Sequence, residues 1–152
     1  MSINLHCSFC GQDPQSIFHV ILDCTFVNQL WSDLTPVLLK IDPTPVSDVE
    51  KAFGILSQTP KATLRNWLTH NLRELIETQE KQAYYNHNYI RNIAEFKRKY
   101  NAKLEKRLHQ VCRSYQQSGN IDAFDKYFRI GDVLLTPTDE DEASFNHPYQ
   151  TP

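Results

Sequence analysis

The sequence predicts a mostly α-helical protein, in which a small N-terminal module is followed by about two to three long helices and a disordered acidic tail. Three observations support this fold class: a cluster of cysteine and histidine residues near the N-terminus, two long stretches with apolar residues at helical spacing, and the placement of the prolines. All eight prolines lie outside residues 61–136, so this middle region can be helical throughout.

The N-terminal module, residues 1–41 including a helix after the last ligand, carries a Cys-x2-Cys-x8-His-x4-Cys array made of Cys7, Cys10, His19 and Cys24. Two residues between the first two cysteines allow a tight turn that points both sulfurs at one ion, and the His-to-Cys spacing suits a helical turn. Three thiolates and one imidazole favour Zn²⁺ over Mg²⁺ or Ca²⁺. We therefore predict a small CCHC zinc-knuckle-like module. His6, which adjoins the first cysteine, remains an alternative ligand.

A shell of four protein ligands leaves no position for water or substrate, so the predicted zinc is structural. The four glycines are too far apart to build a phosphate-binding loop, and the other histidines have no patterned nucleophile or paired carboxylates around them. We therefore expect no enzymatic activity. The sequence has neither a secretory signal nor a run of 18 apolar residues. We expect an intracellular protein of the nucleus or cytoplasm that has no membrane partner.

Residues 42–59 are predicted to be a Pro-containing linker, because Pro43 and Pro45 cannot continue a helix. Thr59 is a favourable N-cap, and Pro60 suits the first helical position. These signals predict a first amphipathic helix that begins at Pro60. A second amphipathic helix follows it and ends near Gly119. The two helices make up a basic helical region, residues 60–118. The apolar stripe of the first helix consists of Leu64, Trp67, Leu68, Leu72, Leu75 and Ile76.

Residues 61–117 of this region carry twelve basic and five acidic side chains. Their net charge is therefore +7, whereas the net charge of the whole chain is −2. Its bases can follow a nucleic-acid backbone, and the interleaved tyrosines can stack on unpaired bases. The alternative is that the charges form a solvated face and the tyrosines close a core. With RNA or single-stranded DNA as the partner, the predicted binding residues are Arg91, Lys97, Arg98, Lys99, Lys103, Lys106 and Arg107.

Residues 119–152 form the acidic tail. We expect it to be largely disordered, because from about Thr136 onwards it combines prolines and four consecutive acidic residues with few apolar side chains. A tail of this charge could fold back on the basic helix and compete with phosphate groups for the same cations.

The segment CSFCGQDPQSIFHVILDCTFVNQLW resembles the zinc-binding domain found downstream of the polymerase in non-LTR (LINE-class) retrotransposon reverse transcriptases. The following helical stretch, to about residue 90, also resembles the region after this module in such elements. That region of the family is thought to hold template RNA or target DNA, so the resemblance implies nucleic-acid binding. The match falls on Cys7, Cys10, Gly11, His19, Cys24, Phe26, Leu30 and Trp31.

The Tyr/Phe-x-Asp-Asp motif of the polymerase is absent from the sequence, so we do not expect reverse transcriptase activity. We interpret the chain as a residual or domesticated fragment of such an element that binds nucleic acid through its basic helix. A different class of function also fits the sequence: a zinc-stabilised helical module that binds another protein without binding nucleic acid. Its apolar helix faces leave self-association open as well.

Overall fold

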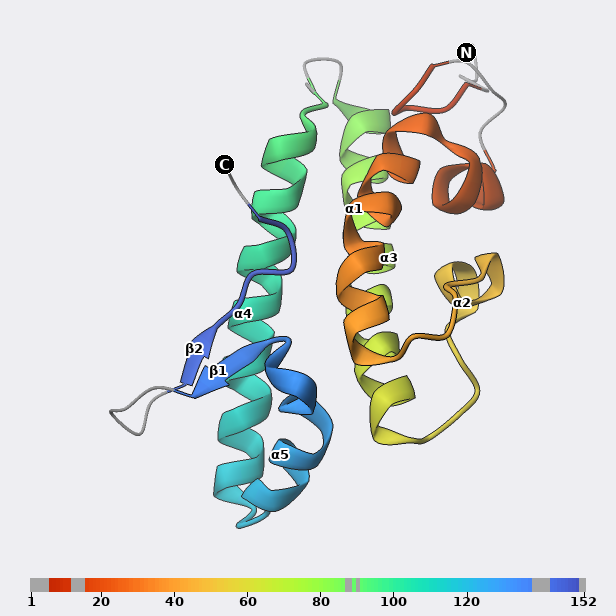
Figure 1. The fold of residues 1–152 in the computed structure, drawn as a ribbon. Helices are drawn as coiled ribbons and strands as arrows, with labels where there is room; N and C mark the ends of the chain where they lie inside the picture. Colours follow the sequence, from red (N-terminus) through yellow and green to blue (C-terminus); the bar gives the residue numbers. More distant parts are fainter. Residues whose placement is uncertain (1–5, 12–15, 87–88, 90, 138–142, 151–152) are drawn as a thin grey trace.

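The computed structural model describes residues 6–11, 16–86, 89, 91–137 and 143–150. The helices are the π-helical turn η1 (His19–Asp23), α1 (Thr25–Ile41), α2 (Asp48–Phe53), α3 (Pro60–Tyr85), α4 (Ile93–Gln117), α5 (Ile121–Phe128) and the 3₁₀ turn η2 (Ile130–Asp132). Two short strands follow, β1 (Leu135–Pro137) and β2 (Ala143–Phe145) (Figure 1). The predicted fold class, a small knuckle-like module followed by helices, is confirmed.

The core of the molecule lies between the three long helices α1, α3 and α4, which all contact one another (Figure 1). Apolar residues at helical spacing on each helix face this core and are removed from water. The hydroxyl of Tyr100 on α4 donates a hydrogen bond to the carbonyl of Leu68 on α3 at 2.8 Å. The fully buried residues of the core include Leu30, Leu34, Leu38, Leu64, Leu68, Leu72, Ile76, Tyr100 and Leu104.

The predicted start of α3 and the predicted end of α4 are confirmed. The side chain of Thr59 accepts a hydrogen bond from the amide of Ala62, and Pro60 is the first helical residue. At the end of α4 the chain leaves the helix through Gly119, whose φ of +71° is a conformation that L side chains rarely adopt.

The structure differs from the prediction in residues 42–59, where helix α2 lies inside the expected linker. The Ser47 hydroxyl caps this helix by accepting a hydrogen bond from the Glu50 amide at 3.1 Å. The carboxylate of Glu50 is buried and pairs with the guanidinium of Arg65 on α3 at 2.6 and 2.7 Å. Arg65 also donates to the carbonyls of Asp42 and Thr44. This segment is therefore held against α3 by a buried ion pair.

The structure also differs from the prediction in the tail, because much of residues 119–150 is folded. Helix α5 buries Phe124 and Phe128, and Phe128 makes an edge contact with the ring of Trp67. The strands β1 and β2 pair antiparallel, with Leu135 opposite Phe145. The tail has a low overall hydrophobicity, but its aromatic residues at helical spacing in α5 give this helix an apolar face that can be buried. The four consecutive acids, residues 139–142, lie outside the described residues.

The last described segment passes between α1 and α4 and is fixed there by Tyr149. The hydroxyl of Tyr149 donates to the carbonyl of Leu30 at 2.8 Å, and its ring is buried. The side chain of Asn101 on α4 bonds both the carbonyl and the amide of Tyr149, at 2.7 and 3.2 Å. This segment therefore lies on the helix that the sequence predicts to be basic. Its contacts there include the hydrogen bonds of Tyr149, the packing of the Tyr149 ring under Lys97, and a contact between His147 and Glu105.

Candidate metal centre

The structure brings the four predicted metal ligands together. The sulfurs of Cys7, Cys10 and Cys24 and a ring nitrogen of His19 all lie within 4.8 Å of one another. The sulfurs of Cys7 and Cys24 are 3.8 Å apart, and the Cys10 sulfur is 3.3 Å from the His19 Nε2. Among the described residues, His6 is not part of this cluster, so the four predicted ligands supply four donor atoms without it.

These separations fit one ion in a tetrahedral shell. With Zn–S bonds of about 2.3 Å and a Zn–N bond of about 2.1 Å, a tetrahedron places two sulfurs about 3.8 Å apart and a sulfur and a nitrogen about 3.6 Å apart. A disulfide between Cys7 and Cys24 would require an S–S distance of about 2.05 Å, and all four cysteines of the chain are free. The donor set and its spacing together describe a cluster that could hold a metal ion.

The first two ligands are presented by a tight turn. The amide of Gly11 donates to the carbonyl of Cys7 at 2.8 Å, and Gly11 adopts a φ of +70°. A residue with a β-carbon would be strained in this conformation. Glycine at this position therefore lets the chain turn sharply enough for the sulfurs of Cys7 and Cys10 to face the same point.

The other two ligands are presented by η1 and by the start of α1. His19 is the first residue of η1, and its amide donates to the hydroxyl of Ser16. The amide of Cys24 donates to the His19 carbonyl at 2.7 Å, five residues earlier, which is the π-helical pattern. Cys24 is then the N-cap of α1. The wider π turn places the His19 ring and the Cys24 sulfur on one side of the backbone.

Two aromatic side chains tie the ligand-bearing segments to the helical body. Phe9, inside the Cys7-to-Cys10 turn, is fully buried; its ring stacks on Phe26 at 5.3 Å and meets Phe96 of α4 edge-on at 6.4 Å. The indole nitrogen of Trp31 donates to the carbonyl of Ile21 in η1 at 2.7 Å. Sequence reasoning missed Phe9, although an aromatic residue inside a metal turn is a usable signal.

Burial controls the protonation of the ligands. Together with a smaller effect of the neighbouring Cys7 sulfur, it raises the pKa of the Cys24 thiol to about 12. Without a metal ion the Cys24 thiol therefore stays protonated at neutral pH. A divalent cation reverses this preference by stabilising the thiolate, so metal binding at this cluster releases protons.

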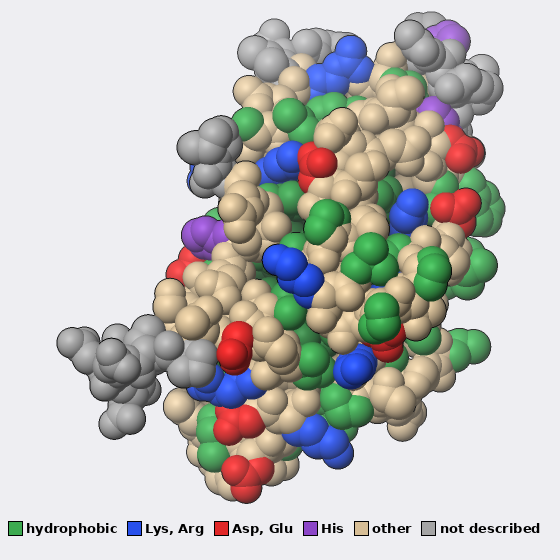
Figure 2. All heavy atoms as spheres, viewed as in Figure 1, with side chains coloured by type: hydrophobic (Ala, Val, Ile, Leu, Met, Phe, Trp, Pro, Cys, Tyr) green, Lys and Arg blue, Asp and Glu red, His purple; other side chains and the backbone are tan. Residues whose placement is uncertain are grey.

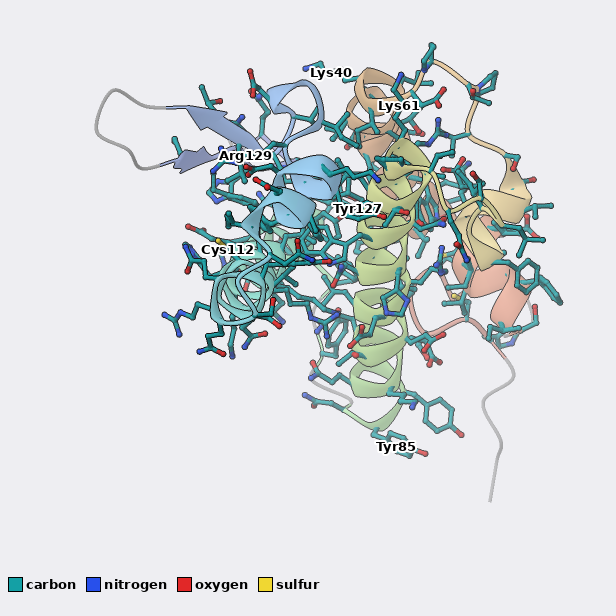
Figure 3. The ribbon with its side chains drawn as sticks, turned by 90° about the horizontal axis from the view of Figure 1, so that it is seen from below. Lys40, Lys61, Tyr85, Cys112, Tyr127 and Arg129 are labelled. Atoms are coloured by element: carbon teal, nitrogen blue, oxygen red, sulfur yellow. The ribbon has the colours of Figure 1, made fainter. Side chains whose placement is uncertain are left out.

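The remaining cysteine and the predicted nucleic-acid-binding residues lie elsewhere. Cys112 is half-buried on α4 (Figure 3), outside the metal cluster. Arg91 lies next to Cys10, Thr25 and Phe26 at the rim of a shallow surface depression. It is exposed, as is Lys106, while Arg98 pairs with Glu95 one turn earlier on the same helix and keeps 61% of its side chain exposed.

The other four predicted cations are occupied within the protein. Lys97 forms an ion pair with Asp33 of α1 and lies over the ring of Tyr149. Lys99 donates to the side chain of Gln79 on α3. Lys103 and Arg107 both pair with Glu74 of α3. These contacts hold α4 against its two neighbours, so a large part of the basic character of α4 stabilises the fold.

The Glu74 cluster gives a pH-dependent contribution to stability. Two hydrogen bonds from Arg107, at 2.7 and 2.9 Å, lower the pKa of Glu74 to about 2 from its ordinary value of 4.5. Because the folded state holds the carboxylate charged, this stabilisation is complete above pH 4.5 and is lost as the pH falls toward 2. We expect the midpoint of thermal unfolding to fall less between pH 5 and 2 in Glu74→Gln than in the wild type, as followed by circular dichroism.

A matched control is Glu105→Gln, because Glu105 is also on the surface of the helices and, among the described residues, forms its ion pair with the ring nitrogen of His147 at 3.3 Å and not with an arginine. Its acid dependence should follow that of the wild type. Equal acid dependence in the wild type and in Glu74→Gln would contradict the assigned role of the pair.

No family model matches the chain, and no curated protein or solved structure matches it either. Among the helices in the described ranges, none combines the length and the apolar character needed to cross a membrane. The functional assignment therefore stands on the metal cluster and the surfaces around it.

Proposed function

We propose that the N-terminal cluster binds one Zn²⁺ ion and that this ion has a structural role. The observation that carries the proposal is the convergence of three sulfurs and one imidazole nitrogen within 4.8 Å, with Cys7, His19 and Cys24 buried. Zinc would be held by Cys7, Cys10, His19 and Cys24, where it supplies a fixed crosslink between the turn, η1 and α1. Four protein ligands complete a tetrahedral shell, so this centre has no catalytic task.

We further propose that the chain derives from the region downstream of the polymerase in a non-LTR retrotransposon reverse transcriptase. What supports this origin is that the residues of the resemblance form one structural unit. The ligands and Gly11 build the cluster, Phe26 packs on the turn, and Leu30 and Trp31 of α1 are buried beneath it. The tryptophan of the Leu-Trp pair that follows the last cysteine therefore has a structural role, because Trp31 holds η1 to α1.

A nucleic-acid-binding role is part of this proposal. We assign it to those of the predicted binding residues whose side chains the fold leaves exposed. Arg91, Arg98 and Lys106 are exposed on or just before α4, and Arg91 adjoins the metal centre. Three phosphate contacts to a single strand predict a slope of about −2 in log K against log salt. The competing function, a protein-interaction module without nucleic-acid binding, predicts almost no dependence on salt.

The test is fluorescence anisotropy with a labelled single-stranded RNA, measured over a range of salt concentrations. The triple variant Arg91→Gln, Arg98→Gln, Lys106→Gln should lose at least about 30-fold in affinity at low salt and flatten the salt slope. The control variant Lys40→Gln, Lys61→Gln, Lys126→Gln removes the same charge elsewhere; Lys40 and Lys61 lie at the end of the bundle away from Tyr85 (Figure 3). Equal affinities of the two triple variants would contradict nucleic-acid binding at the proposed surface.

A further inference from the structure

Five large apolar side chains are exposed around η1 and α2. They are Ile17 (64% exposed), Phe18 (57%), Val49 (64%), Phe53 (72%) and Leu56 (106%), and we call them the apolar patch. Figure 2 shows hydrophobic side chains gathered at the edge of the molecule where η1, α2 and the loop after α2 lie in Figure 1. A soluble chain seldom leaves this many adjacent apolar side chains in water unless they meet a partner.

The patch is continuous across its segments. The rings of Phe18 and Phe53 meet edge-on with centroids 6.4 Å apart, and η1 and α2 contact each other. Val49 and Phe53 are four residues apart on α2, so they share one face of that helix. Residues from before η1 and from α2 therefore form a single surface, and Leu56 follows Phe53 by three residues.

The loop that carries Leu56 is held in place. The side chain of Asn66 on α3 accepts a hydrogen bond from the amide of Ile55 at 2.7 Å and donates one to its carbonyl at 2.8 Å. Gly54, at the end of α2, has a φ of +87°, and a β-carbon there would lie 2.8 Å from the Asn66 oxygen. Leu56 is thus projected into solvent from a fixed backbone.

A hollow adjoins the patch. This groove of about 400 Å³ lies between η1 and α3, with Ile17, Val20 and Ile21 on one side and the charged residues Glu77, Glu80 and Lys81 of α3 on the other. Ile17 belongs to both the groove and the patch, so projecting side chains and a hollow that can receive them lie next to each other. A surface that carries both features can be complementary to a copy of itself under two-fold symmetry.

We infer that the apolar patch is the interface with a second copy of this chain. The five side chains expose roughly 600 Å² per chain, so a two-fold pair that covers them completely buries about 1,200 Å², the lower end of the range for specific interfaces. The charges at its edge also suit self-pairing: Asp48 and Lys51 on α2 neutralise each other at 3.8 Å. These two side chains together therefore bring no net charge to the edge of the patch.

This interface goes beyond the proposed zinc and nucleic-acid roles, and it uses none of the exposed cations assigned to phosphate binding. It depends on the metal centre through Ile17 and Phe18, which directly precede the ligand His19, and through Val20 and Ile21, which lie in η1 between two ligands. Its test therefore uses the full chain loaded with zinc, so that a failure of the interface is distinguishable from a failure of the metal site.

The experiment is sedimentation velocity over a concentration series up to about 100 μM, the range where an interface of this size associates. The wild type should form a dimer, and the double variant Phe53→Asp, Leu56→Asp should weaken it at least about 30-fold, because carboxylates would then be buried against their own copies. Both residues are exposed, so melting temperatures should match the wild type. As a second variant, Val49→Lys places one charge on the same face and should also give monomer.

The control is Ile121→Asp, which changes an exposed apolar residue at the first position of α5, where an acidic side chain is compatible with the helix. This variant should dimerise like the wild type. Three outcomes would overturn the inference: a wild-type chain that stays monomeric throughout, a Phe53→Asp, Leu56→Asp variant that remains dimeric, or a monomer that uses the patch to bind phosphatidylcholine vesicles.

Discussion

Removing the metal ion, by chelation or by Cys24→Ser, is expected to unfold residues 6–11 and 16–24 and to destabilise the helical body that they pack against. Structural zinc in small finger domains contributes about 10–16 kcal/mol of apparent binding free energy, which is as large as the whole stability of a typical domain. The N-terminal segment has few apolar residues of its own to replace that contribution; the main ones are Phe9, Val20 and Ile21. Their packing positions are set by the ligand turn and η1.

The measurement is thermal unfolding followed by far-ultraviolet circular dichroism. A loss of at least about 5 kcal/mol corresponds to a fall of about 10–20 °C in the midpoint for a chain of this length. Cys112→Ser is the matched control, because Cys112 lies outside the metal cluster on α4 and should lower the midpoint by only a few degrees. A chelated protein that melts at the same temperature as the untreated one would contradict the structural role of the ion.

Replacing Glu50 by alanine is expected to have the second largest effect. The Glu50 and Arg65 side chains are 5% and 2% exposed, and their charges meet at 2.6 Å. Breaking a buried pair by removing one partner costs about 3–5 kcal/mol, because the other charge stays buried without compensation. Arg65 would keep its bonds to two backbone carbonyls, but these leave its positive charge unpaired.

The comparison that isolates the pair is a double-mutant cycle with Glu50→Met and Arg65→Met, in which unfolding free energies come from urea titrations. The double variant should be clearly more stable than Glu50→Met alone, since it no longer buries an unpaired guanidinium. If Glu50→Met costs less than about 1 kcal/mol, the ion pair does not hold α2 against α3.

The metal ligands and the long helices were predictable because their signals are local. Cys7 and Cys10 are three residues apart, and His19 and Cys24 are five apart, so each pair meets within one turn of backbone. The start of α3 was predictable for the same reason, since Thr59 and Pro60 act on the adjacent turn. A pattern that is completed within a few residues needs no knowledge of the tertiary fold.

Features that depend on contacts between distant segments escaped sequence reasoning. The linker prediction followed from Pro43 and Pro45, whereas α2 gains its anchor from Arg65, fifteen residues beyond Glu50. The tail prediction followed from average composition, whereas Tyr149 fills a position between α1 and α4. The local sequence also could not tell which bases of α4 pair internally, because their acidic partners lie on other helices. Packing partners were the missing information in each case.

The central claim is that Cys7, Cys10, His19 and Cys24 hold one zinc ion. Its most direct test is the metal content of the intact chain by mass spectrometry under native conditions, with wild type and Cys10→Ser purified side by side and dialysed against metal-free buffer. One zinc ion per wild-type chain and none in Cys10→Ser is the predicted result. Equal metal content in the two proteins, or a wild-type chain that carries no zinc, would contradict it.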